Sequence, residues 1–192
     1  MGYRMRFIGL TILFFGLVCV ALAEDYHLQY FLTKISSQTN ELSKNERVEL
    51  LNRIDEVMRQ AKQIHLKLVQ AIQTGEMEIR YQEGRFWMSK LEEDQEAIDS
   101  GAQQLNILRE KPMHLVAAIK LYKSLKDLSF HFNTYNNMSC FSACIGDMAP
   151  EIELWVDPVF YKLYLLPLAQ AKSSETKSPT KEKKPEGKGK KP

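Results

Sequence analysis

A long amphipathic repeat after Ser43 constrains the fold of this 192-residue chain more than any other feature. Between Ser43 and Gly75, apolar residues recur at alternating steps of three and four, which is the spacing of one face of an α-helix. A second apolar series repeats every seven residues beside the first and widens the stripe. The segment predicts a helix of about 30 residues that must bury one face along its whole length. The stripe consists of Leu50, Leu51, Ile54, Val57, Met58, Ala61, Ile64, His65, Leu68, Ala71 and Ile72.

Local signals mark both ends of this helix. Ser43 and Glu46, in the sequence SKNE, have the spacing of a capping box, in which each side chain accepts a hydrogen bond from the other residue's backbone amide. Gly75 is the residue type that most often ends a helix, because it adopts a left-handed backbone conformation at no steric cost. We therefore expect the helix to begin after Ser43 and to stop at Thr74–Gly75.

The next segment carries two different patterns. Residues 77–82 alternate apolar and polar side chains shortly before Gly84, which suits a strand followed by a turn. From Trp87 to about Lys111 the apolar residues return to helical spacing. These patterns predict a second long helix, with an interruption near residues 99–101 or a β-hairpin at its beginning as alternatives.

Three further helices are predicted from apolar spacing and from proline positions. One covers residues 28–35, and Pro112 suits the first turn of another that continues to about residue 132. Asp157–Pro158 has the residue types of a helix cap and a first helical residue, and Pro167 should kink or end the helix that follows. Long helices with short connections pack antiparallel. The predicted fold is therefore an all-α, up-and-down helical bundle of the four-helix type with an additional C-terminal helix.

The first 23 residues have the layout of a secretory signal peptide. Arg4 and Arg6 precede an apolar run, and the sequence ALA provides a small-x-small cleavage site before Glu24. An uncleaved anchor is the alternative, because the run is close to the shortest length that spans a bilayer. Lipid attachment at Cys19 is disfavoured, since Leu17-Val18 precedes it. The sequence thus predicts an exported protein, periplasmic or secreted, whose mature chain starts at Glu24.

The C-terminal segment differs sharply from the rest of the chain. Residues 172–192 have no aromatic or aliphatic side chain and carry eight Lys against three Glu, a net charge of +5. This composition predicts a disordered tail, because too little apolar area is present to offset the entropy of ordering. Removing the tail and the two signal-peptide arginines from the whole-chain +2 leaves −5 for residues 24–171, the predicted single domain. The tail either attracts the protein to an anionic envelope surface or only aids solubility.

The chain contains no recognisable catalytic motif. His-Glu-x-x-His, Gly-x-Ser-x-Gly and Cys-x-x-Cys-His are all absent, no cofactor is predicted, and no motif points specifically to nucleic acid. His65 and Asp94 fall on the apolar stripes of the two long helices. There a polar side chain either fixes helix register or forms a buried acid–base pair. The first interpretation is favoured, and no catalytic residue is predicted.

Cys140 and Cys144, in the sequence MSCFSACIGDMAP, are the only cysteines after residue 23. A disulfide staple is the favoured interpretation, because an exported protein meets an oxidising compartment. Asn136-Asn137 before the pair and Gly146 after it favour a turn, since the spacing suits a bridge poorly in a straight helix.

A soft-metal site is the alternative for this segment. It resembles in part the cysteine loop of binuclear copper sites, although Met148 stands where that loop has a histidine. Thiolate, thioether and imidazole ligands suit copper. The candidate ligands are Met138, Cys140, Cys144, Met148 and His131.

The segment that begins at Trp155 is apolar around most of its circumference. Such a helix is usually buried in a core, but beside a basic tail it is also a candidate contact surface for a partner protein or a membrane face. The residues of this candidate surface are Trp155, Phe160, Tyr161 and Tyr164. The sequence predicts an exported, non-enzymatic bundle that acts by contact with a protein or an anionic envelope surface, with copper binding as the alternative. Membrane contact is expected only through the signal peptide or peripherally.

Overall fold

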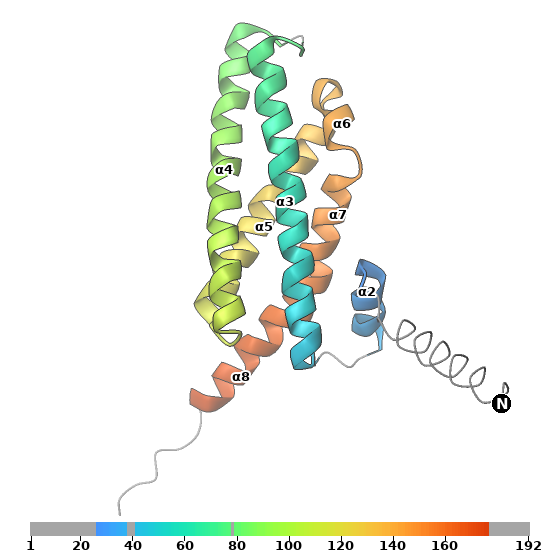
Figure 1. Cartoon of the computed structure of the whole chain (residues 1–192), viewed down its shortest axis with the longest axis vertical. Helices are drawn as coiled ribbons and strands as arrows, with labels where there is room; N and C mark the ends of the chain where they lie inside the picture. Colours follow the sequence, from blue (N-terminus) through green and yellow to red (C-terminus); the bar gives the residue numbers. More distant parts are fainter. Residues whose placement is uncertain (1–25, 38–40, 78, 177–192) are drawn as a thin grey trace, which may run out of the picture.

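The computed structural model describes residues 26–37, 41–77 and 79–176, and all regular structure in these ranges is helical (Figure 1). α3, α4 and α5 run lengthwise beside one another, and α7 with η2 forms a further rod packed on α5. The predicted all-α class is confirmed, and the packing is that of a helical bundle. The elements in chain order are α2 (Leu28–Ser36), α3 (Lys44–Thr74), α4 (Tyr81–Glu110), α5 (Leu115–Asn136), α6 (Ser139–Ile145), α7 (Met148–Leu154), the π-helix η2 (Trp155–Leu165) and α8 (Leu166–Thr176).

Two predicted segments fall wholly or partly outside the described residues. The predicted signal peptide, residues 1–23, lies outside them, and so does the tail from residue 177 onward. α8 continues through Lys172 to Thr176, so the C-terminal helix extends into the segment predicted to be disordered. Among the described helices, none combines the length and the apolar character needed to cross a bilayer.

α3 has both of its predicted ends. The Ser43 hydroxyl accepts a hydrogen bond from the Glu46 amide at 3.3 Å, and the Glu46 carboxylate accepts one from the Ser43 amide at 2.7 Å. Gly75 follows the last turn in the left-handed region, with φ of 73°. The buried Glu46 carboxylate also accepts the Tyr30 hydroxyl at 2.5 Å and pairs with Lys34, which ties α2 to α3. Burial alone would raise the pKa of Glu46, but these hydrogen bonds outweigh it and lower the pKa to about 2.

α4 is one unbroken helix. It begins at Tyr81, and no strand occurs in the described ranges, so the β-hairpin alternative is wrong. It also continues without interruption through residues 99–101. Gly101 faces Met58 of α3 and Ser124 of α5, and a Cβ added there would collide with the end of the Met58 side chain. The glycine therefore serves close helix packing and does not end the helix.

α5 begins three residues later than Pro112, which was predicted to lie in its first turn. Nδ1 of His114 accepts a hydrogen bond from the Ala117 amide at 3.0 Å and caps the helix before Leu115. The Pro112 carbonyl lies in the preceding turn and accepts the Tyr164 hydroxyl at 2.9 Å. α5 packs against α4, α6, α7 and η2, which makes it the central helix of the bundle.

The C-terminal segment is helical without a break from Met148 to Thr176. Asp157–Pro158 lies inside η2, which continues α7 and leads into α8, so the predicted helix start there is wrong. Asp157 instead accepts the Tyr122 hydroxyl at 2.7 Å and pairs with Lys126, both on α5. The i to i−5 hydrogen bonds of a π-helix accommodate Pro158, whose ring and missing amide disrupt the α-helical pattern. Pro167 lies in the first turn of α8 and does not end the helix, and α8 runs at an angle to α7 (Figure 1).

Aromatic side chains fill the core where the helices meet. Trp87 of α4, Tyr135 of α5 and Phe141 of α6 contact one another edge to face, with ring centroids 5.4 to 5.8 Å apart. Phe31 of α2 contacts Trp155 of η2 in the same way at 5.9 Å. Such pairs contribute roughly 0.5–1.5 kcal/mol each beyond area burial. The first cluster holds α4, α5 and α6 together next to Asp94, which Tyr135 also contacts.

Candidate functional site

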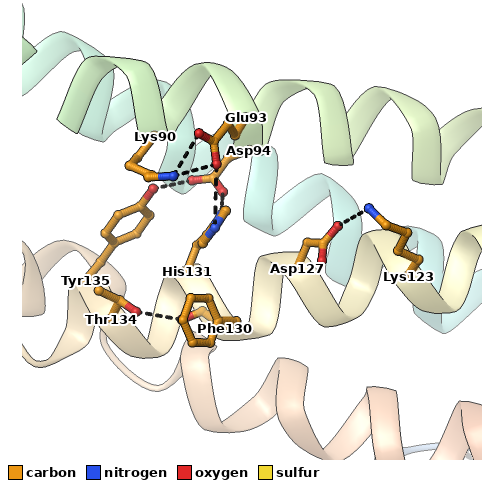
Figure 2. A network of polar contacts seen from close by, with 9 residues as sticks. All are labelled: Lys90, Glu93, Asp94, Lys123, Asp127, Phe130, His131, Thr134 and Tyr135. Carbon is orange, nitrogen blue, oxygen red and sulfur yellow. Dashed lines mark hydrogen bonds and ion pairs between the residues drawn. The ribbon is translucent and has the colours of Figure 1, made fainter. Parts of the chain in front are cut away.

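Asp94 of α4 is a carboxylate with no exposed surface, held between two side chains of α5 (Figure 2). Its Oδ1 lies 2.5 Å from Nδ1 of His131, and its Oδ2 accepts the Tyr135 hydroxyl at 2.6 Å. His131 and Tyr135 are four residues apart, so they project from one face of α5. The network therefore joins the middle of α4 to α5 by two short hydrogen bonds.

The network favours a protonated His131. The hydrogen bond to Asp94 raises the pKa of His131 above its ordinary value of 6.5, although burial opposes the rise. Burial and the neighbouring charge of Asp94 also raise the pKa of Tyr135, so its phenol keeps the proton that it donates. The raised pKa of His131 thus favours an ion pair between its imidazolium and the buried Asp94 carboxylate.

The second nitrogen of His131 faces another carboxylate. Nε2 lies 3.9 Å from Glu93, which Lys90 contacts at 2.8 Å (Figure 2). A histidine oriented by a buried carboxylate acts as a general base when a nucleophile stands at its other nitrogen. In the part of the chain that the structure describes, no hydroxyl or thiol hydrogen-bonds to His131. The geometry favours a lock that holds α4 and α5 in register over an assembled catalytic centre.

His65 and Asp94 do not form the acid–base pair that the sequence allowed. Both side chains are buried, but the hydrogen-bond partners of Asp94 are His131 and Tyr135. Nδ1 of His65 has no partner among the described residues. Burial lowers the pKa of His65, against the opposing charge of Asp94, so the neutral imidazole is favoured. A buried polar atom without a hydrogen bond reduces stability.

Cys140 and Cys144 lie one turn apart on α6, and not in a turn as predicted. Both thiols are free, so the predicted disulfide is absent. The physical reason is the helix, in which residues four apart have Cβ atoms about 5–6 Å apart. A disulfide needs Cβ atoms about 3.5–4.5 Å apart. Both cysteines are half-buried and pack against the hydrophobic core.

The other predicted copper ligands have separate roles. Met138 precedes the first turn of α6, Met148 is buried at the start of α7, and Nδ1 of His131 is bonded to Asp94. Over residues 26–37, 41–77 and 79–176, no three His, Cys, Asp or Glu side chains cluster as metal ligands would. The structure brings together the two cysteines on one helix face and leaves His131 in the Asp94 network.

The predicted aromatic contact surface is largely in the core. Trp155, Phe160 and Tyr164 are buried, and the rings of Phe160 and Tyr164 stack at 5.2 Å. Tyr161 is 39% exposed and is the member of the set that a partner can reach. The guanidinium of Arg47 lies 5.8 Å from the centre of the Tyr164 ring and covers it. These aromatic residues thus anchor η2 to the bundle.

Sequence reasoning missed an exposed apolar patch where α4 connects to α5. Met113, Val116 and Ile119 are 50%, 57% and 49% exposed, although apolar side chains of this size are usually covered. The signal available from the sequence was that Val116 falls off the buried stripe of α5. A shallow hollow of about 490 Å³ there is lined by Lys111, Met113, Val116 and Lys172 of α8, among others. We define the apolar–basic patch as Met113, Val116, Ile119, Lys111, Lys120 and Lys172.

The patch combines two kinds of side chain on neighbouring helices. Lys120 follows Val116 by four residues, so both lie on one face of α5. Lys172 comes from α8, immediately before the most basic part of the sequence.

No protein-family model, curated protein or solved structure matches this chain.

Proposed function

We propose that this chain is an exported, non-enzymatic helical-bundle protein that attaches to an anionic membrane surface through the apolar–basic patch. In this proposal α3, α4, α5 and the α7–η2 rod form a four-helix-type, up-and-down bundle. α8 is the additional C-terminal helix, and a disordered basic tail follows it. The observation that carries the proposal is a hollow at one end of the bundle where half-exposed Met113 and Val116 meet Lys111 and Lys172. Half-exposed Ile119 and the neighbouring Lys120 lie one turn beyond Val116 on α5.

The charge distribution supports an end-on orientation. Residues 24–171 carry −5 and residues 172–192 carry +5. An anionic surface repels the first part and attracts the second, so the end that carries α8 approaches first. A Lys held close to an anionic membrane contributes about 1 kcal/mol, and salt screens this contribution. Lys111 and Lys120 add two positive charges at this end, and Glu110 adds one negative charge.

The apolar side chains alone give weak attachment. Fully burying an aliphatic side chain contributes about 1.5–3 kcal/mol. Because Met113, Val116 and Ile119 are half-exposed, inserting all three contributes on the order of 2–4 kcal/mol. Stable peripheral binding usually requires two signals, such as an apolar insertion and a basic segment. The patch and the tail together supply both kinds.

Vesicle co-sedimentation tests this proposal. The mature protein should bind phosphatidylglycerol vesicles, bind phosphatidylcholine vesicles poorly, and dissociate as salt rises. The double variant Val116→Gln, Ile119→Gln and a truncation after Thr176 should each weaken binding. The control is Leu66→Gln, Phe86→Gln, which replaces two apolar side chains that are each 54% exposed on α3 and α4. Equal loss in the control and the patch variant would show that the patch is not the contact.

Binding of Cu(I) by α6 is a second candidate function. One observation favours it: the free thiols of Cys140 and Cys144 stand one turn apart on the same helix face. Two thiolates at this spacing suit a soft, monovalent ion. Titration of the reduced protein with Cu(I) should then show a site that is lost in Cys140→Ser, Cys144→Ser. Unchanged affinity in that variant would exclude the metal function.

A further inference from the structure

An open cavity lies where α3 ends and α4 begins, at the end of the bundle opposite to α8 (Figure 1). Its volume is about 590 Å³, which falls within the range of small-molecule sites, about 300–1,000 Å³. The apolar part of its lining consists of the half-buried side chains of Ile72, Met77, Ile79 and Met88. The two thioether side chains are flexible, so this lining can adapt to aliphatic groups of different shape.

Gly84 keeps this cavity open. It lines the cavity from the first turns of α4, and a Cβ added there would meet Ile72 at an ordinary contact distance of 4.0 Å. A larger side chain at this position would therefore extend into the cavity without a backbone clash. The alternation of Met77 and Ile79, which suggested a strand in the sequence, instead supplies two apolar side chains to this lining.

Two arginines stand at the rim of the cavity without partners. Arg80 and Arg85 are exposed and line the cavity, and their guanidinium groups form no hydrogen bond or ion pair within the part of the chain that the structure describes. By contrast, Arg53 and Arg109 each contact a carboxylate. A guanidinium binds a carboxylate or phosphate through two parallel hydrogen bonds. Among the lining residues that the structure describes, Glu92 is the acidic one, so these residues together carry one net positive charge.

We infer that this cavity binds a small amphiphile with an aliphatic chain and one anionic head group. The chain occupies the lining formed by Ile72, Met77, Ile79 and Met88. The head group, a carboxylate or a phosphate, lies at Arg80 and Arg85. An uncharged molecule with the same chain lacks the second interaction and binds more weakly. The inference does not depend on the apolar–basic patch, which lies at the other end of the bundle.

Isothermal titration calorimetry of the mature protein tests the inference with three probes: decanoate, decyl phosphate and decanol, each below its aggregation concentration. At least one anionic probe should bind about tenfold or more tightly than decanol, because it adds a charge-assisted contact. Whichever of decanoate and decyl phosphate binds more tightly identifies the head group. The double variant Arg80→Gln, Arg85→Gln should weaken the anionic probes to the affinity of decanol.

Two further variants separate this site from nonspecific uptake. Gly84→Leu places a side chain in the cavity beside Ile72, retains both arginines and should weaken binding of all three probes. Arg59→Gln removes a charge from an arginine that is 69% exposed on α3 and should leave binding unchanged. Circular dichroism melts verify that each variant is folded. Because Arg80 and Arg85 are exposed, the double arginine variant should remain folded and tests the site even if Gly84→Leu unfolds. Binding that is equal for decanol and the anions, or equal in the wild type and the arginine variant, would overturn the inference.

Discussion

Replacing Asp94 with Asn removes a fully buried charge and keeps the side-chain volume. The carboxylate accepts hydrogen bonds from His131 and Tyr135 at 2.5 and 2.6 Å. A hydrogen bond to a charged group contributes about 1.5–3 kcal/mol, compared with about 1 kcal/mol between neutral groups. With two such bonds weakened, Asp94→Asn should lower the free energy of unfolding by about 2 kcal/mol. For a domain of this size, that corresponds to a fall of about 4–8 °C in the melting temperature.

The same substitution should change the pH dependence of stability. The pKa of His131 in the folded protein is raised above 6.5 by Asp94. The ion pair therefore contributes fully below pH 6.5, and its contribution is lost as pH rises through the raised pKa. In Asp94→Asn the carboxylate that raises the pKa is gone. As pH rises through the raised pKa of His131, the wild type should lose stability and Asp94→Asn should lose less.

Urea unfolding followed by circular dichroism at about pH 5.5, 7 and 8.5 measures both effects. The control is Asp127→Asn, which removes a carboxylate that pairs with the exposed Lys123 one turn away on α5 (Figure 2). The control should unfold at the wild-type urea concentration. If Asp94→Asn matches the wild type in midpoint and in pH dependence, the network does not lock α4 to α5.

Three further predictions concern Glu46, His65 and the two cysteines of α6. The pKa of Glu46 is lowered from 4.5 to about 2, so the wild type should lose on the order of 3 kcal/mol as pH falls through this interval; Glu46→Gln should lack this loss in acid unfolding curves. The pKa of His65 is lowered below 6.5 in the folded protein. The unfolded chain therefore binds a proton at His65 more readily than the folded protein does, and stability should fall as pH falls below 6.5. His65→Leu should raise the free energy of unfolding at neutral pH by about 1 kcal/mol and reduce the loss of stability in acid. A lower free energy of unfolding would contradict the absence of a hydrogen bond at Nδ1 of His65. Iodoacetamide should alkylate both Cys140 and Cys144 in unreduced protein, and a mass spectrum that shows a bridged, unreactive pair would contradict the helical geometry of α6.

Signals between near neighbours in the chain were sufficient to predict the ends of α3. Ser43 and Glu46 are three residues apart, and Gly75 acts through its own backbone conformation. The same local reasoning failed at Asp157, which has the residue type of a helix cap. Its partners on α5, Tyr122 and Lys126, are 35 and 31 residues earlier in the chain, and no local sequence pattern predicts these contacts. The cap prediction was wrong because tertiary contacts and π-helical hydrogen bonding outweighed the local preference.

Helical periodicity predicted which face of a helix is buried, but not which side chains meet across the interface. It placed His65 and Asp94 on buried stripes, and both are buried. It did not predict that Asp94 would bond to His131 and Tyr135, which are 37 and 41 residues later. The apolar–basic patch was missed for a related reason. The exposure of Val116 depends on which face of α5 its neighbouring helices leave uncovered, and that is decided by packing.

The most direct test of membrane attachment is to find which part of the bundle enters the lipid. An environment-sensitive fluorophore is attached to Val116→Cys in a Cys140→Ser, Cys144→Ser background, and in a second sample to Leu66→Cys. The two positions are similarly exposed, at 57% and 54%. Addition of phosphatidylglycerol vesicles should increase and blue-shift the emission of the fluorophore at position 116 and leave the emission at position 66 unchanged. High salt should abolish the change at position 116. Equal responses at both positions, or none at position 116, would contradict attachment through the apolar–basic patch.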